Sequence, residues 1–286
     1  MWSKYGLRAS EVGLLKIDDV DLDQMLIMLR KTKEYLIMQI KLLLSFILAV
    51  VLFVVSPVYA GELPTYSELQ KALKEVVKED NGGFGLNMWA TIVDRDGVVK
   101  AVVFSGGDRG DQWPGSRVIS AQKANTANAF SLPDLSLSTA NLFSAVQPGG
   151  SLYGLQHSNP VDTNVAYGGS TKKIGTENDP MVGKKIGGVN VFGGGLALYN
   201  EDGKLLGAIG LSGDSSCADH NIAWKVRHKL KMDYIPAGVS PNKDDNTVND
   251  IVDGVSSSGW GHPVCSPEAT DIAKGFSKTH PVRSKK

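Results

Sequence analysis

Two short turns that end in glycine divide β-prone sequence into hairpins, and they constrain the fold of this chain more than any other feature. Each turn separates two runs rich in apolar and β-branched residues: 88–93 and 98–104 around Asp94–Gly97, and 189–199 and 205–211 around Asn200–Gly203. The Asp-Gly pair in each turn supplies the positive φ that tight hairpin turns require. The sequence therefore predicts two antiparallel hairpins.

Apolar residues at helical spacing predict three helices, over about 67–78, 117–130 and 217–231. Thr65 and Glu68 form a capping box at the start of the first, and Ser116 is the expected cap of the second. Ala121, Ala124 and Ala127 leave one side of the second helix small enough for a backbone or a flat ligand to approach closely.

Three further segments carry little periodicity. Residues 138–146 predict a short helix, and residues 154–188 predict a long loop rich in glycine, asparagine and lysine. Loops of that length inside a compact domain are often functional. The residues from 232 to 286 are rich in Ser, Asn, Asp and Pro, and we expect an extended C-terminal tail pinned back by Cys265.

Residues 38–60 have the sequence pattern of a secretory signal peptide: a lysine near the start, an apolar run over 42–55, and the cleavage-site ending Val58-Tyr59-Ala60. We expect cleavage after Ala60, a periplasmic or secreted mature protein, and no stable membrane span after cleavage. Residues 1–37 are then a mis-assigned upstream extension. The alternative is a retained membrane anchor preceded by a short cytoplasmic segment.

The net charge and the cysteine content limit which partners and metal sites the sequence predicts. The formal net charge of zero gives no indication of a nucleic-acid partner. The chain has two cysteines, Cys217 and Cys265, which in an oxidising compartment predict a disulfide. Cys217 and His220 are three residues apart and could both face one metal ion. Because the expected disulfide occupies the sulfur atom and no second Cys/His pair is expected to have ligand spacing, no structural zinc site is expected.

The stretch from Gly207 to Trp224, GAIGLSGDSSCADHNIAW, concentrates polar residues where a strand passes into a helix. It lacks the G-x-S-x-G spacing of a nucleophile elbow, so it does not indicate a hydrolase. Ser215 or Ser216 is the expected helix cap, with Asp219 in the first turn. His220 shares a helix face with Cys217 rather than with the apolar stripe, which leaves it either a surface residue without a role or a functional one.

Several motifs in the same order resemble the GlcG/HbpS family of heme-binding domains, which is related to the C-terminal domain of PduO-type proteins. The motifs are IVDRDG at 92–97, KANTA at 123–127, GGG at 193–195, and GAIGLSG at 207–213 followed by Asp219, and the resemblance covers about 67–230. It implies an α+β domain over residues 61–231, with an antiparallel β-sheet flanked by α-helices in a profilin-like arrangement. It also implies binding of heme or a related tetrapyrrole, often by a homo-oligomer.

Carried onto this sequence, the resemblance suggests five binding residues. Thr126 is the expected oxygen ligand, Lys123 the expected partner of a heme propionate, and His157 and His220 the competing nitrogen donors, with Asp219 beside them. The alternative for Lys123 and Thr126 is a solvated helix face. The chain departs from the family pattern in an insertion over about 148–188, in a cysteine at 217 and in the C-terminal extension, and the insertion could cover or replace the usual groove.

The function expected from the sequence is an exported heme-binding protein that acts in heme capture, storage or sensing rather than in turnover. One alternative is an enzyme on the same scaffold, either peroxidase-like with heme or using Asp219 and His220 as an acid–base pair. The other is a module that binds a different small molecule.

Overall fold

The computed structural model describes residues 23–24, 28, 30–39 and 62–285 of the 286-residue chain. The chain divides into two units, Met1–Tyr59 and Ala60–Lys286. In the first unit, residues 30–39 are helical. The expected signal peptide falls almost wholly outside the described residues, and so does its cleavage position. None of the described helices combines the length and hydrophobicity needed to cross a bilayer.

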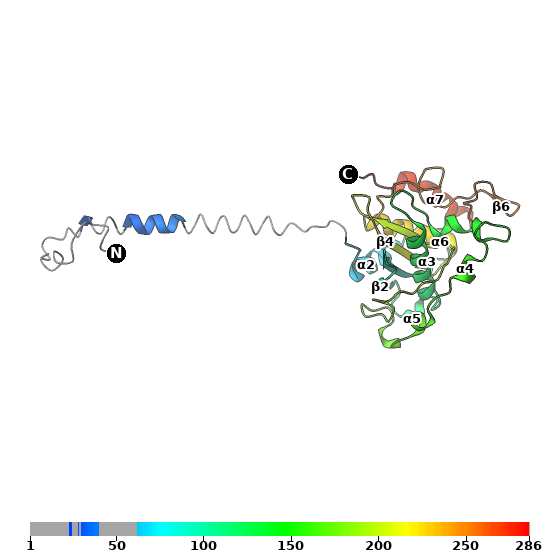
Figure 1. Ribbon diagram of the computed structural model, residues 1–286, viewed down its shortest axis with the longest axis horizontal. Coiled ribbons are helices and arrows are strands. Elements are labelled where there is room, and N and C mark those ends of the chain that lie inside the picture. The colour runs from blue at the N-terminus through cyan, green and yellow to red at the C-terminus, as the bar shows by residue number, and fades with distance from the viewer. Residues whose placement is uncertain (1–22, 25–27, 29, 40–61, 286) are drawn as a thin grey trace. The chain divides into compact units, whose positions relative to one another are not determined.

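The second unit is built on a four-stranded antiparallel sheet in the order β2-β1-β4-β3, and β2 and β4 are labelled in Figure 1. Its strands are β1 (Trp89–Asp94), β2 (Val99–Phe104), β3 (Gly195–Tyr199) and β4 (Leu205–Ser212). Both predicted hairpins are confirmed, and their turn glycines, Gly97 and Gly203, have φ of +75° and +71°. The first strand of the second hairpin starts at Gly195, later than expected.

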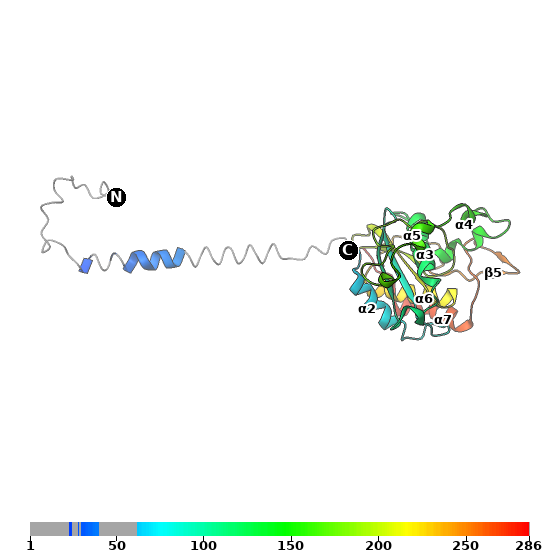
Figure 2. The ribbon, with the colours of Figure 1, turned by 90° about the horizontal axis from the view of Figure 1, so that it is seen from below.

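Helices cover both faces of this sheet, and the mixed α+β class expected from the sequence is confirmed. They are α2 (Tyr66–Val76), α3 (Ser116–Phe130), α4 (Leu155–Ser158), α5 (Thr163–Tyr167), α6 (Ser216–Lys229) and α7 (Pro267–Thr279). Figure 2 shows α2, α6 and α7 along one side and α3, α4 and α5 along the other. Successive side chains of β1 alternate between the two cores: Ala90 and Ile92 face α2 and α6, whereas Trp89 and Val93 face α3.

The alanine side of α3 packs directly on the sheet. Ala121, Ala124 and Ala127 are fully buried. A Cβ atom added at Gly210 of β4 would lie 2.4 Å from the backbone nitrogen of Ala124 and 2.0 Å from the carbonyl oxygen of Ser120. The small residues therefore admit a strand, and no room for a flat ligand remains on this side of the helix.

Local signals at the helix ends are mostly confirmed. Thr65 and Glu68 form the predicted capping box of α2, and Ser215 caps α6 by accepting from the backbone N–H of Ala218. The cap of α3 differs: Gly115 occupies the position without a side-chain bond, and Ser116 is the first helical residue. The short helix predicted over 138–146 forms as two 3₁₀ turns, Thr139–Leu142 and Ser144–Val146.

The long insertion packs against α3 and the neighbouring strands. Arg117 on α3 donates from Nε to Asp179 Oδ2 at 2.9 Å and from a terminal nitrogen to the backbone oxygen of Ala166 at 2.9 Å. Met181 and Ile186 are fully buried in the core beneath α3. Of the two possibilities given for the insertion, covering or replacing the usual groove, the structure shows that it covers this face of the domain.

The expectation of an extended C-terminal tail is wrong for its second half. Residues 267–279 form α7, which begins with Ser266 as its cap and Pro267 in its first turn. Phe276 of α7 stacks on Trp224 of α6, with ring centroids 5.4 Å apart and ring planes within 3°. The residues that precede α7 are polar and show no periodicity, and the predicted tail included α7 together with them. Its apolar face was therefore not recognised as that of a helix. Between Met232 and α7 the tail also contains the short strands β5 (Ile251–Val252) and β6 (Val255–Ser256).

Candidate functional site

Two of the predicted site residues, Lys123 and Asp219, form a buried ion pair that links α3 to the start of α6. Lys123 Nζ donates to Asp219 Oδ2 at 2.6 Å and to the backbone oxygen of Leu211 at 2.9 Å. Asp219 Oδ1 accepts from the backbone N–H of Asp214 at 2.8 Å. Burial lowers the pKa of Lys123 and raises the pKa of Asp219, and their mutual attraction opposes both shifts. The ammonium group is therefore held inside the domain.

The glycine run before β3 allows the backbone to pass beside this pair. A Cβ atom at Gly194 would lie 3.1 Å from Asp219 Cβ and 3.3 Å from Lys123 Nζ, and one at Gly193 would lie 2.3 Å from the carbonyl oxygen of Ser216. Gly194 also has a φ of +112°, which a residue with a side chain rarely adopts. Gly193 and Gly194 therefore allow the backbone to come close to α6 and to the ion pair.

Thr126 is also buried and engaged in internal hydrogen bonds. Its hydroxyl donates to the backbone oxygen of Gln122 at 2.8 Å and accepts from the backbone N–H of Asn190 at 3.0 Å. It thus ties the segment before β3 to α3. Its assignment as a heme ligand stays a prediction, and ligation would require both of these bonds to rearrange.

His220 is fully buried, which excludes the first of the two alternatives that the sequence left open, a surface residue without a role. Neither ring nitrogen has a hydrogen-bond partner among the described residues. Burial lowers the pKa of His220 to about 3, and the nearby Asp245 offsets only part of this effect. The imidazole is therefore neutral at physiological pH. The tail that covers α6 accounts for its burial, and a helical wheel of α6 alone does not reveal that cover.

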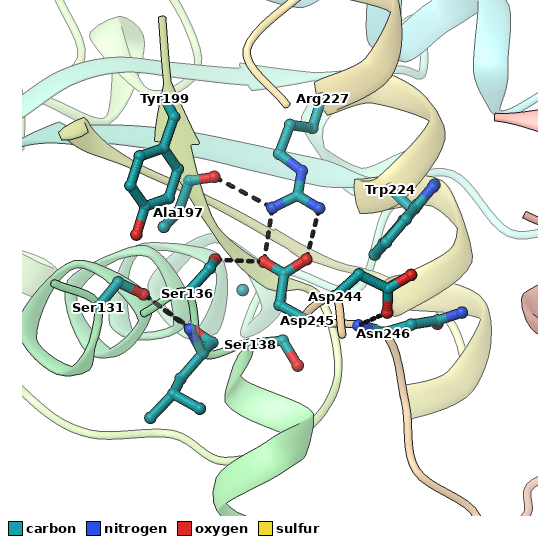
Figure 3. Close-up of polar contacts among 12 residues, drawn as sticks. Ser131, Ser136, Ser138, Ala197, Tyr199, Trp224, Arg227, Asp244, Asp245 and Asn246 are labelled. Atoms are coloured by element: carbon teal, nitrogen blue, oxygen red, sulfur yellow. Dashed lines mark hydrogen bonds and ion pairs between the residues drawn. The ribbon is translucent and has the colours of Figure 1, made fainter. Parts of the chain in front are cut away.

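A second buried ion pair joins Arg227 of α6 to Asp245 of the tail (Figure 3). Arg227 donates to both oxygens of Asp245, at 2.6 and 2.7 Å, and Ser136 Oγ donates to Asp245 Oδ2 at 2.7 Å. The guanidinium carbon lies 4.8 Å from the centroid of the Trp224 ring. Burial raises the pKa of Asp245, but Arg227 and Ser136 lower it by more, so the carboxylate stays charged. Sequence reasoning missed Asp245 because its tail segment shows no periodicity.

The predicted disulfide between Cys217 and Cys265 is confirmed, and a histidine that the sequence reasoning did not single out lies beside it. His262 is 2% exposed. Its Nε2 lies 2.8 Å from Ser216 Oγ, and its Nδ1 lies 2.8 Å from the backbone oxygen of Pro263. Burial lowers the pKa of His262 to about 4, and Lys123 adds to this effect. His262 and Cys265 are three residues apart, so the expectation that no second Cys/His pair has ligand spacing is wrong. That spacing is the sequence signal that could have pointed to His262.

His157, the remaining predicted donor, lies in α4 within the insertion and is exposed. It is outside the buried polar region that contains Lys123, Asp219 and His220. Two hollows on the surface, one beside α7 and one at the start of α2, are lined by other residues. Among the predicted nitrogen donors, His157 is the one open to solvent.

Comparison with known proteins adds a family to this geometry. The sequence model of the family "Haem degrading protein HbpS-like" matches residues 65–227. The corrinoid adenosyltransferase PduO of Citrobacter freundii is 33% identical over 128 residues, which cover 44% of this chain and 30% of that enzyme. The chain thus spans less than a third of that relative.

Solved structures of similar chains include a PduOC–heme complex, with 26% identity, a TM-score of 0.40, and coverage of 57% of this chain and 89% of that one. The Klebsiella pneumoniae protein ORFY has 22% identity, a TM-score of 0.39, and coverage of 61% and 97%. HbpS has 16% identity, a TM-score of 0.35, and coverage of 59% and 92%.

Proposed function

The chain belongs to the HbpS-like family, and on that basis we propose that it is an exported heme-binding protein that acts in heme capture, storage or sensing. The observation that carries the proposal is the family match over 65–227, which includes α2, the whole sheet, α3 and most of α6. The signal-like grammar of residues 38–60 supports export. The PduOC–heme complex is a similar chain seen with heme, and it adds no geometry for this one.

The residues of this chain differ in how well they suit heme. An axial ligand needs a free lone pair and access to a large flat group. The Thr126 hydroxyl and the Lys123 ammonium group are committed to internal bonds. His220 has unpaired ring nitrogens but no exposed surface, so it could bind iron only after the tail moved aside.

His157 fits an accessible heme best. It is exposed, and Tyr153, four residues earlier, is 65% exposed and offers a flat apolar surface. Their sequence neighbours Leu152 and Leu155 are partly buried and pack against the hydrophobic cluster that contains Leu142. In this proposal His157 would hold the iron, and the ring of Tyr153 would supply apolar contact to the porphyrin. Bound heme would supply the iron-centred redox chemistry, and the chain would orient and shield it.

A heme titration of the purified full chain, with the disulfide intact, tests this function. We expect a saturable shift of the Soret band at one heme per chain. His157→Ala should weaken binding, whereas His220→Ala, at a buried position, is the matched imidazole control. If His220→Ala or Thr126→Ala weakens binding and His157→Ala does not, the site lies in the buried region. The absence of a saturable shift would exclude heme as the ligand and favour a module that binds another small molecule.

Heme degradation, which the family description names, is the second candidate function. Asp219 and His220 are poorly suited to acid–base catalysis, because both are buried and Asp219 is paired with Lys123. Any degradation would therefore depend on the bound heme itself. The test compares how fast peroxide bleaches the Soret band of the heme-loaded protein and of free heme. If the loaded protein loses the band no faster than free heme does, heme degradation is eliminated as a function.

Export and assembly have separate tests. N-terminal sequencing of the protein recovered from the extracytoplasmic fraction should start at Gly61, and an unprocessed start would favour the retained anchor. We also propose a homo-oligomer, as the family resemblance implies. Light scattering coupled to size-exclusion chromatography should give a mass of two or more chains. A monomer at all concentrations would contradict the proposed homo-oligomer.

A further inference from the structure

Three side chains that can bind metals meet where the tail joins the start of α6. The side-chain ligand atoms of Cys217, His262 and Cys265 all lie within 4.8 Å of one another, and Cys217 Sγ is 4.0 Å from His262 Nδ1. The two sulfur atoms are joined in the disulfide. The oxidised centre therefore has one imidazole and no thiolate to offer.

The disulfide is open to attack from one side. Cys265 is exposed, whereas Cys217 is 5% exposed. An external dithiol would attack Cys265 Sγ, and Cys217 would leave as a thiolate in the first turn of α6. The positive end of a helix stabilises a thiolate in that position. The second thiol of the reductant then attacks the mixed disulfide, so the reductant is oxidised and the protein holds two reduced cysteines.

We infer that the disulfide and a zinc site are alternative states of these side chains: once reduced, Cys217, Cys265 and His262 bind one Zn²⁺. Two thiolates and one imidazole are preferred ligands of Zn²⁺, and three protein ligands leave a fourth position for water. Zinc with two thiolates and a neutral imidazole carries no net charge, which suits a partly buried site. Binding would release the two thiol protons.

The distances require only small movements. Ligand atoms around tetrahedral zinc lie about 3.5 to 3.8 Å apart, as follows from typical Zn–S and Zn–N bond lengths. His262 Nδ1 would therefore move closer to Cys217 Sγ by about half an ångström from its present 4.0 Å. The two sulfur atoms would separate once their bond is broken, and Cys265 lies on an exposed segment that can move outward.

The neighbours of His262 already suit the change. The backbone oxygen of Pro263 can only accept a hydrogen bond, so Nδ1 carries the proton in the oxidised state and Nε2 accepts from Ser216. In the zinc state the proton moves to Nε2, which donates to Ser216 Oγ, and Nδ1 turns its lone pair to the metal. Ser216 would then orient the imidazole, as outer-shell partners of zinc-bound histidines do.

Cobalt provides a direct probe, because thiolate-bound tetrahedral Co²⁺ absorbs strongly. The full chain is reduced with a dithiol, desalted without oxygen and titrated with Co²⁺, followed by displacement with Zn²⁺. We expect one Co²⁺ per reduced chain with thiolate charge-transfer bands, and none in the oxidised chain. His262→Gln should weaken Zn²⁺ binding at least about tenfold, since even outer-shell changes cost 10- to 100-fold. His280→Gln, at the C-terminal end of α7 and outside this cluster, is the matched control and should bind as the wild type does.

Other results would overturn the inference. Equal binding by the oxidised chain would place the metal elsewhere, and undiminished binding by His262→Gln would reduce the site to an ordinary thiol pair. If the reduced chain loses its near-ultraviolet circular dichroism, Zn²⁺ should restore the signal in the wild type but not in His262→Gln. No restoration in the wild type also refutes the zinc state. None of these readouts involves heme.

Discussion

The buried pair of Lys123 and Asp219 permits a sharp test of whether these residues support the fold or bind a ligand. Their side chains are 1% and 3% exposed, and Nζ lies 2.6 Å from Oδ2. In Lys123→Met the carboxylate would stay buried without its cation, keeping only the N–H of Asp214 as a partner. Breaking a buried pair from one side costs about 3 to 5 kcal/mol, so we expect a loss of that size in the free energy of unfolding.

Removing both charges should cost less than removing one. In Lys123→Met combined with Asp219→Leu no buried charge remains, and the main deficit is the Asp214 N–H, which loses its acceptor at about 1 to 3 kcal/mol. The double variant should therefore be more stable than Lys123→Met alone. The control is Lys100→Met, because Lys100 pairs with Asp94 at 3.7 Å on the surface and is 49% exposed. That change should shift the unfolding free energy by less than about 1 kcal/mol.

Urea unfolding at neutral pH, with the disulfide intact, compares the wild type, Lys123→Met, the double variant and Lys100→Met. Stability is read from the unfolding midpoint, provided that the slope of the transition is unchanged. The reasoning fails if Lys123→Met is as stable as Lys100→Met, or if the double variant is less stable than Lys123→Met. A heme titration completes the test. Loss of heme affinity in Lys123→Met, with stability unchanged, would restore the interpretation of Lys123 as a propionate partner.

Three other predictions concern stability. The pKa values of buried His220 and His262 are lowered to about 3 and about 4, so the stability they contribute is fully present above their ordinary pKa of about 6.5 and is lost as the pH falls below it. Urea unfolding from pH 7.5 to 4 should show this decline, less steep in His262→Gln, and a flat profile would contradict it. Reduction of the disulfide, whose cysteines are 48 residues apart, should lower the unfolding free energy by about 4 kcal/mol in the absence of metal; a midpoint that does not move would exclude this estimate. Gly210→Ala should cost about 1 to 3 kcal/mol or more because its Cβ would meet the α3 backbone, whereas Gly275→Ala, with open space around it in α7, should gain up to about 1 kcal/mol. Thermal unfolding compares the two, and equal midpoints would refute the packing argument.

Those elements of the fold that depend on neighbouring residues were predictable from the sequence. The capping box of Thr65 and Glu68, the Asp94–Gly97 turn and the Ser215 cap each involve atoms within a few residues of one another, and each formed as expected. The cysteines were predictable for a different reason. With two of them in the chain, only one intramolecular pairing exists.

The environment of each candidate site residue was not predictable, because it depends on segments far away in sequence. A helical wheel places His220 and Arg227 on the less apolar face of α6 and predicts solvent there. The tail covers that face instead, with Asp245 bonded to Arg227 and Phe276 stacked beside Trp224. Polar residues in the tail looked like linker sequence, although Asp245 and His262 are buried partners of α6.

It follows that the tail is part of the folded domain rather than an appendage to it. A chain ended after residue 231 would leave the Arg227 guanidinium without Asp245 and Cys217 without its disulfide partner, while Trp224 would lose its stacked ring. An unpaired buried charge alone costs several kcal/mol, which is comparable to the whole stability of many domains. The family match ends at residue 227, before this cover begins. Any functional residue carried from the family onto α6 must therefore be judged with the tail in place, and His220 shows how far the tail changes the result.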